Sequence, residues 1–215
     1  NFFETKDQAD SANKAESLLA KPRIYKKQME EVEKELAGKK AQIDIDSKLI
    51  EDYLAKNNIK AQKTKWGTYV AILTEGTGEK MDSRYIATVN YTGRTLDSGF
   101  VFDSNTDPAF NHMQPYPVNL AELGGVILGW SDALQKKKKG TKATIFIPSS
   151  LGYGENGNGD KIKPNAILVF DMDIVDAATE EEYLAKQQQM QEEMLRKSSE
   201  LSDPKNKDNK QPEKK

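Results

Sequence analysis

Six aromatic side chains and one carboxylate recur across the middle of this 215-residue chain: Tyr91, Phe102, Asp103, Tyr116, Trp130, Tyr153 and Phe170. Taken singly, each aromatic residue is typical of a buried core. Taken together, they suit non-covalent binding of an apolar group, because aromatic rings exclude water and offer no nucleophile. The chain has no cysteine, which excludes thiol catalysis, and one histidine. That histidine, His112, stands in a polar segment, and we interpret it as a surface residue around which no Ser/His/Asp triad can be assembled.

Five short motifs contain most of these residues: 90–93 (NYTG), 101–104 (VFDS), 126–130 (VILGW), 152–154 (GYG) and 168–171 (LVFD). In their order and spacing they resemble the FKBP-type peptidyl-prolyl isomerases. The resemblance implies an α+β fold in which a curved antiparallel β-sheet packs on one short helix. It also implies a shallow aromatic cup that binds a proline ring and eases rotation about the bond before it.

The resemblance further implies a role for each site residue. The implied catalytic residues are Tyr91, Phe102, Asp103, Trp130, Tyr153 and Phe170. The implied substrate-binding residues are Tyr116, Val126, Ile127 and Ile162, the last in a loop that hangs over the cup. Trp130 is implied as the floor, and the Ile127 N–H and the Tyr153 hydroxyl as donors to substrate carbonyls. Two positions depart from the family pattern, because Tyr116 stands where phenylalanine is usual and Asn158 replaces an aromatic or imidazole residue.

Isomerisation of this kind requires no covalent step. Rotation about an X–Pro bond costs ~18–20 kcal/mol because the planar amide has partial double-bond character. The uncatalysed exchange takes roughly tens to hundreds of seconds. The twisted amide is less dipolar than the planar one, so a dry apolar pocket favours it. A thousandfold acceleration requires only about 4 kcal/mol of this preference, and the prediction therefore includes no cofactor and no metal.

Composition divides the chain into a centre rich in glycine and β-branched residues and flanks rich in Ala, Glu, Lys and Gln. We expect an N-terminal helical arm over 1–62, an isomerase domain over 63–177, a C-terminal helix over 178–198 and a disordered tail over 199–215. In the arm, Pro22 suits a first helical position, and a second helix is expected from about Asp46 to Lys56. Thr179 and Glu182 fit a capping box at the start of the C-terminal helix.

Inside the central domain, the pattern predicts short strands and one helix. Alternating or apolar runs indicate strands over 68–73, 85–91, 100–103, 116–120, 142–147 and 166–175. The helix is predicted over 126–135, and the polar residues 105–115 are expected to form a loop. The two helices of the arm need a partner surface, since short isolated helices are marginal in water. That partner is the other helix, the central domain or a second copy of the chain.

Two motifs resemble cofactor or ion sites without meeting their requirements. Residues 152–157 satisfy G-x-G-x-x-G, but the residues that follow, up to Pro164, cannot open the helix that a dinucleotide site needs. Residues 103–107 resemble the start of a calcium loop, but Pro108 replaces its glycine and Gln114 its final glutamate. The net charge is −2 and charges of both signs are interleaved, so no nucleic-acid surface is predicted.

Functions of different classes fit these observations. The first is a prolyl isomerase that speeds the folding of proline-containing and unfolded protein clients. The alternative is a chaperone or peptide-binding module with little or no turnover, and a weaker third is a scaffold whose arms dock a fixed partner. The layout is similar to that of bacterial envelope FKBPs, whose N-terminal helices serve dimerisation and client binding. The resemblance thus extends to a homodimer through the arm and to FK506- or rapamycin-like macrolides as ligands.

The same resemblance bears on location. It implies the bacterial periplasm, or a lipoprotein tethered to the outer membrane, and a cytoplasmic location stays open. The chain starts at Asn1 rather than Met, so we expect that an upstream segment was removed. No apolar run approaches the roughly 20 residues of a membrane span.

Overall fold

The computed structural model describes the backbone of residues 6–202 and the side chains of residues 20–199. The chain divides into two compact units between Ala177 and Ala178. Helices α1 (Lys6–Gly38) and α2 (Lys40–Lys56) belong to the first unit together with the sheet. Helix α4 (Glu180–Ser202) belongs to the second. Among the described helices, none combines the length and the apolar character needed to span a membrane.

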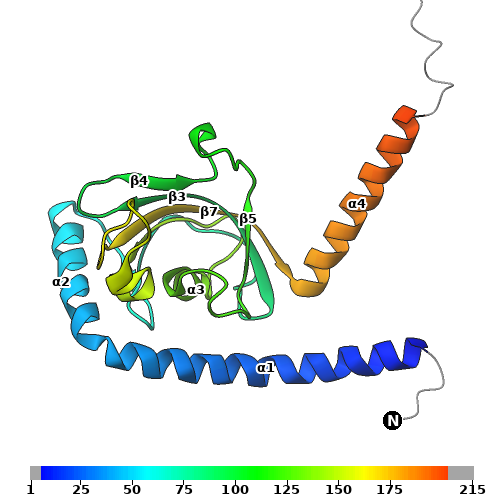
Figure 1. Ribbon diagram of the computed structural model, residues 1–215, viewed down its shortest axis with the longest axis horizontal. Helices are drawn as coiled ribbons and strands as arrows, with labels where there is room; N and C mark the ends of the chain where they lie inside the picture. The colour runs from blue at the N-terminus through cyan, green and yellow to red at the C-terminus, as the bar shows by residue number, and fades with distance from the viewer. Residues whose placement is uncertain (1–5, 203–215) are drawn as a thin grey trace, which may run out of the picture. The chain divides into compact units, whose positions relative to one another are not determined.

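A curved sheet organises the first unit (Figure 1). In spatial order its strands are β1 (Gln62–Lys63), β2 (Tyr69–Thr74), β6 (Lys142–Ile147), β7 (Leu168–Thr179), β3 (Tyr85–Thr95) and β4 (Val101–Ser104). Strand β5 (Tyr116–Asn119) pairs with β3 outside this order. The pairs β1–β2, β2–β6, β6–β7, β3–β4 and β3–β5 are antiparallel. The sheet curves over helix α3 (Leu128–Leu134), which confirms the predicted α+β fold.

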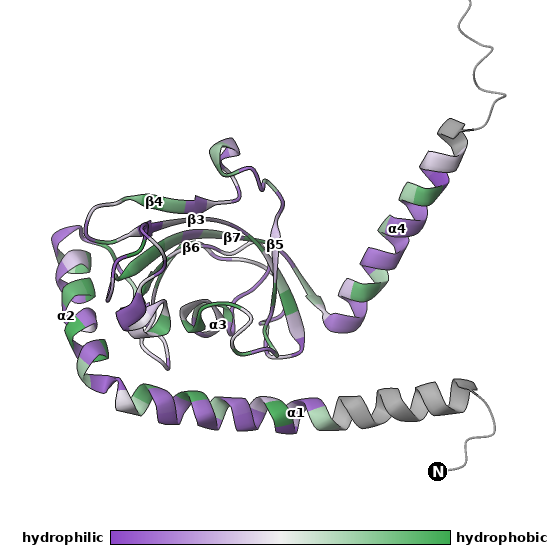
Figure 2. Cartoon of the chain, viewed as in Figure 1, coloured by the Kyte–Doolittle hydropathy of each residue, from purple (hydrophilic) through white to green (hydrophobic). Residues whose placement is uncertain are grey.

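Both faces of the sheet are covered, one in a cluster with α3 and the other in a cluster with α2. Successive strand residues point to opposite sides, so one strand contributes to both clusters. In β6, Ile145 and Ile147 belong to the cluster that contains Trp130 of α3. Phe146, between them, belongs to a second cluster with Ile50 of α2. Figure 2 shows the contrast between the hydrophobic β7 and the mainly hydrophilic α1 and α4. Of the partner surfaces considered for α2, the central domain is therefore the one observed.

The helices of the arm differ from their predicted bounds. Helix α1 continues through Pro22, which was expected to start a helix. The residues of α1 before Pro22 are rich in Ala and Lys and include two Leu, and their helix propensity outweighs one missing backbone hydrogen bond. Helix α2 begins at Lys40 rather than near Asp46. A pair between Lys40 and Asp44 (2.5 Å) supports this first turn.

The start of α4 confirms the predicted capping box. The Glu182 carboxylate accepts hydrogen bonds from the Thr179 N–H (2.8 Å) and hydroxyl (2.9 Å), and the Glu182 N–H donates back to the hydroxyl (3.4 Å). The helix ends at Ser202, so the tail predicted from residue 199 is wrong for 199–202. The reason is that no helix breaker occurs before Pro204. The rest of the predicted tail, 203–215, lies outside the described residues.

A buried carboxylate fixes the segment between β1 and β2 to helix α3. Asp132 accepts hydrogen bonds from the Thr64 hydroxyl and from the N–H groups of Trp66 (3.2 Å) and Thr68 (3.3 Å). Burial raises the pKa of Asp132, because the cost of desolvating the carboxylate exceeds the benefit of these hydrogen bonds. Asp132 therefore positions α3, which carries Trp130, relative to the sheet.

A second buried carboxylate fixes α2 to the sheet domain. Asp46 accepts hydrogen bonds from the N–H (2.7 Å) and hydroxyl (2.6 Å) of Ser149. Ser149 begins η2 (Ser149–Leu151), the 3₁₀ turn that precedes Tyr153. Asp46 thus ties the helical arm to the segment that carries a predicted site residue.

We expect Asp46→Ala to lower the free energy of unfolding by about 1–3 kcal/mol, because it leaves two buried donors of Ser149 without an acceptor. Urea denaturation measures the change. Asp52→Ala is the matched control, since Asp52 lies on the same helix, is 61 % exposed and pairs with Lys48. Its change should stay within about 0.5 kcal/mol. Equal losses in the two variants would contradict the anchoring role of Asp46.

Candidate functional site

The predicted site residues line one cavity of about 280 Å³, with one exception. We call this cavity the cup. Its lining consists of Tyr91, Phe102, Asp103, Tyr116, Gly125, Val126, Ile127, Trp130, Tyr153 and Phe170. The exception is Ile162, which is buried in the cluster that contains Trp130 and is not among the residues that line the cup. Backbone hydrogen bonds between Asn158 and Ile162 (2.7 and 3.2 Å) close this loop on itself, with the Ile162 side chain in the core.

The aromatic rings come from separate elements and meet edge to face. Tyr91 lies on β3, Phe170 on β7, and Trp130 on α3. The Trp130 ring centroid is 4.9 Å from that of Tyr91 and 5.2 Å from that of Phe170, at interplanar angles of 72° and 88°. Phe102 meets Phe170 at 5.6 Å and 83°. Edge-to-face pairs stabilise one another, so the rings hold the shape of the cup without a ligand.

The close approach of two of these rings depends on Gly93. A β-carbon at this position would lie 2.5 Å from Cε1 of Phe170 and 2.8 Å from ring atoms of Phe102. Real β-carbons do not approach other atoms so closely, so only glycine leaves both rings in place. This requirement explains why the NYTG motif ends in glycine.

Hydrogen-bonding groups at the cup differ in whether they already have a partner. The Tyr91 hydroxyl donates to Oδ2 of Asp103 at 2.7 Å. Burial, followed by this hydrogen bond, raises the pKa of Tyr91, so the hydroxyl keeps its proton. Neither the Tyr153 hydroxyl nor the Ile127 N–H donates to another described residue. These two donors are therefore available to carbonyl groups of a bound peptide.

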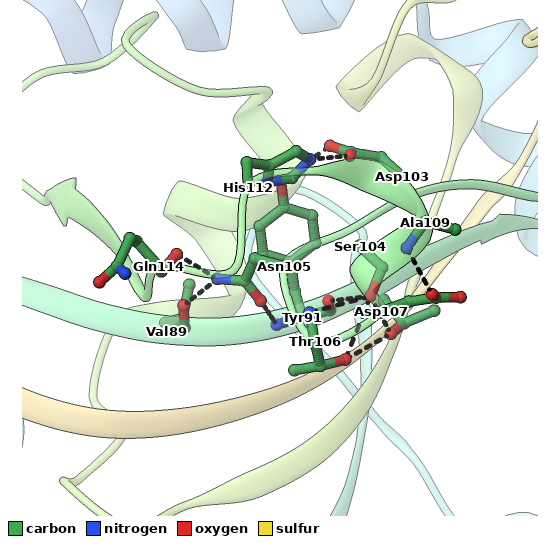
Figure 3. Close-up of polar contacts among 11 residues, drawn as sticks. Val89, Tyr91, Asp103, Ser104, Asn105, Thr106, Asp107, Ala109, His112 and Gln114 are labelled. Carbon is green, nitrogen blue, oxygen red and sulfur yellow. Dashed lines mark hydrogen bonds and ion pairs between the residues drawn. The ribbon is translucent and has the colours of Figure 1, made fainter.

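Two residues that contact or support the site were not predicted from the sequence. His112 is exposed, as expected, but its Nε2 lies 2.7 Å from Oδ1 of Asp103 (Figure 3). Asn105 is buried, and its carboxamide bonds the backbone at Val89 and Tyr91. The polar segment 105–115 has no periodic pattern from which either contact could have been inferred. Spacing alone therefore gave no signal for them.

The two motifs that resembled ion or cofactor sites have other structural roles. In the calcium-like segment 103–107, Asp103 binds Tyr91 and His112, and Asp107 accepts the Ala109 N–H (2.9 Å) to cap η1 (Pro108–Phe110). The glycine-rich segment 152–157 forms the 3₁₀ turn η3 (Gly154–Asn156). It presents Tyr153 to the cup.

Comparison with known proteins gives relatives of one kind. The family model of the FKBP-type peptidyl-prolyl cis-trans isomerases matches residues 77–175 of this chain. A probable FKBP-type peptidyl-prolyl cis-trans isomerase FkpA of Neisseria meningitidis serogroup B is 38% identical over 164 residues, which is 76% of this chain and 57% of that protein. An FK506-binding protein of the same organism is 37% identical over 109 residues, which is 51% of this chain and 94% of that protein. The chain spans about half the length of the FkpA-type relatives.

Solved structures give the same result. The crystal structure of a peptidyl-prolyl cis-trans isomerase from Pseudomonas syringae pv. tomato has a TM-score of 0.51 at 32% identity and covers 65% of this chain and 96% of that one. FkpA from Escherichia coli has a TM-score of 0.52 at 24% identity, covers 81% of this chain and 74% of that one, and supports the fold alone. The matched residues include strands β3, β4, β5 and β6, most of β7, helix α3 and every residue that lines the cup. With one relative covered almost completely, the chain belongs to the FKBP-type peptidyl-prolyl cis-trans isomerase family.

Proposed function

We propose that this chain is a peptidyl-prolyl cis-trans isomerase that assists protein folding. The observation that carries the proposal is the cup, in which the indole of Trp130 and the rings of Tyr91, Phe102 and Phe170 surround an open cavity. Trp130 lines this cavity and is 5 % exposed, so the indole offers a bound proline ring an apolar surface that has little contact with water. Such a surface favours the less dipolar, twisted amide over the planar one.

In this mechanism the protein supplies orientation and a dry environment. The Tyr153 hydroxyl and the Ile127 N–H hold peptide carbonyls on either side of the rotating bond, and the proline ring rests on Trp130. The Asp103 carboxylate, fixed by Tyr91, lies at the wall of the cup and sets the electrostatic field there. Because no covalent bond forms or breaks, the whole rate enhancement comes from preferential binding of the transition state.

The substitution Asp103→Ala tests the proposal in a protease-coupled assay with a proline peptide. We expect the wild type to accelerate isomerisation and the variant to lose about tenfold in kcat/KM, which corresponds to about 1.4 kcal/mol. Asp173→Ala is the control, because Asp173 lies on β7 and pairs with Lys142 away from the cup. If the wild type is inert but still suppresses aggregation of a denatured client, the chaperone function replaces the isomerase function.

The remaining parts of the proposal concern ligands, partners and location. Proline-containing peptides, unfolded clients and FK506- or rapamycin-like macrolides would share the cup, where Tyr116 adds a polar group to the wall. We place the activity in the bacterial periplasm, free or as a tethered lipoprotein. This placement is supported by the likeness in layout to envelope FKBPs and by the bacterial relatives. A homodimer through the helical arm stays a prediction, which a mass measurement in solution tests.

A further inference from the structure

The loop between β4 and β5 is tied to the strand that carries Tyr91 (Figure 3). Its first residue, Asn105, is 3 % exposed. The Asn105 carboxamide oxygen accepts the Tyr91 N–H at 2.7 Å, and its nitrogen donates to the carbonyl groups of Val89 (3.0 Å) and Gln114 (2.9 Å). One buried side chain therefore holds the beginning and the end of the loop against β3.

Between these fixed ends, the loop returns toward the cup. Asp107 caps the 3₁₀ turn η1, and Asn111 follows it in the left-handed conformation, with φ at 57°. This reversal brings His112 to Asp103, with 2.7 Å between Nε2 and Oδ1. The other carboxylate oxygen, Oδ2, accepts the Tyr91 hydroxyl at the same distance, 2.7 Å. Each oxygen of the cup's carboxylate is thus held by a different side chain.

We propose that His112 is a positioning residue for Asp103, and that the charge of this one imidazole makes the isomerase activity depend on pH. The inference rests on the proposed isomerase function. His112 does not line the cup, so it acts through Asp103 rather than on the substrate. The position of the carboxylate in the wall of the cup then depends on a loop residue.

The chemistry of imidazole gives the direction of the effect. Imidazole changes its charge between about pH 5 and pH 8. The imidazolium always carries a proton on Nε2, and its hydrogen bond to a carboxylate is charge-assisted. The neutral ring carries one proton on either nitrogen, so only one of its two tautomers can donate from Nε2. Deprotonation of His112 therefore weakens its hydrogen bond to the Asp103 carboxylate.

The His112 ring contacts or faces groups from three described elements. Asp103 of β4 is the anion in direct contact. The Tyr91 ring of β3 lies 6.5 Å away, and the Phe110 ring of η1 lies 6.4 Å away. On the Phe110 ring, in turn, the Lys161 Nζ stands 5.8 Å from the centroid. The charged group in direct contact with His112 is therefore the Asp103 carboxylate.

The test measures peptide exchange by NMR between pH 5.5 and 8.5, without a coupling protease. For the wild type we expect kcat/KM to fall about two- to fivefold as the pH rises, the range that a partly exposed ion pair supports. The loss should appear in kcat more than in KM. His112 is the only histidine of the chain, so its ring proton can be followed in the same samples. The two titration midpoints should coincide.

Three variants and a control separate positioning from a general structural role. His112→Gln keeps an uncharged donor, and its kcat/KM should not change with pH. His112→Arg should also have a kcat/KM that does not change with pH, at the value that the wild type has at acidic pH. His112→Ala should have the lowest kcat/KM of the set, again without a change with pH. Met113→Ala, an exposed neighbour on the same loop, should follow the wild type. All four should keep the wild-type urea midpoint.

Two results would overturn the inference in distinguishable ways. If the wild type is active and His112→Gln retains the wild-type pH profile, His112 does not position the carboxylate, and the proposed function stands. If the folded wild type is inert at every pH, the proposed function itself fails, and the inference fails with it.

Discussion

Trp130→Ala is expected to lower kcat/KM for a proline peptide by about 100-fold, or about 2.7 kcal/mol of transition-state stabilisation. The indole meets the rings of Tyr91 and Phe170 and forms the surface on which the proline ring would rest. Its removal leaves a void that water can enter, and water stabilises the planar, dipolar amide. The variant should also lose about 3–5 kcal/mol of folding stability, as large aromatic truncations do.

A milder variant separates these two effects. Trp130→Phe keeps an aromatic ring and should fold with a smaller loss of stability, while the shallower floor still lowers kcat/KM. The measurement combines urea denaturation with peptide exchange on the same samples. If Trp130→Phe and Trp130→Ala both remain folded and as active as the wild type, the indole is part of the core and has no role in the reaction.

Ile50→Ala is expected to lower the free energy of unfolding by about 2–5 kcal/mol. Ile50 is fully buried, and it joins the cluster that contains Phe146 and Val169 on the face of the sheet opposite the cup. Leu49→Ala is the matched control, because Leu49 precedes Ile50 on the same helix and is 53 % exposed. Its change should stay within about 0.5 kcal/mol, and denaturation in urea measures both.

This prediction affects the use of truncations to study the helical arm. A deletion of residues 1–60 removes α2 and uncovers Tyr69, Phe146 and Val169 on the sheet. The truncated protein would lose folding stability, so a loss of client binding could not be assigned to the arm alone. A deletion that ends before Lys40 leaves α2 in place and tests α1 alone. Equal stability of Ile50→Ala and Leu49→Ala would show that α2 does not cover the sheet.

The elements of the sheet domain could be predicted because their patterns are local. Strand β6 has the predicted bounds, since its alternation places Ile145 and Ile147 on one face and Phe146 on the other. The bounds of the arm could not be predicted equally well. Helix propensity on both sides of Pro22 outweighed the signal of one proline. The burial of Asp46 depends on Ser149, more than a hundred positions later in the chain.

The site shows the same distinction. The cup residues stand in motifs whose order resembles a family, so they could be named before their rings were seen together. Ile162 has the residue type of a lining position, but its side chain lies in the core, in a loop closed by backbone hydrogen bonds to Asn158. The contact of His112 with Asp103 depends on a buried Asn105 and on a left-handed Asn111. Neither feature follows from a periodic sequence pattern, because both depend on the tertiary structure of an irregular loop.

The isomerase function is tested most directly by exchange NMR on a short proline peptide with a small fraction of the wild-type protein. We expect the cis and trans peptide signals to exchange much faster than in the peptide alone, and the peptide to shift the Trp130 indole resonance. A folded protein that leaves the exchange at its spontaneous rate, with the indole signal unmoved, would contradict it.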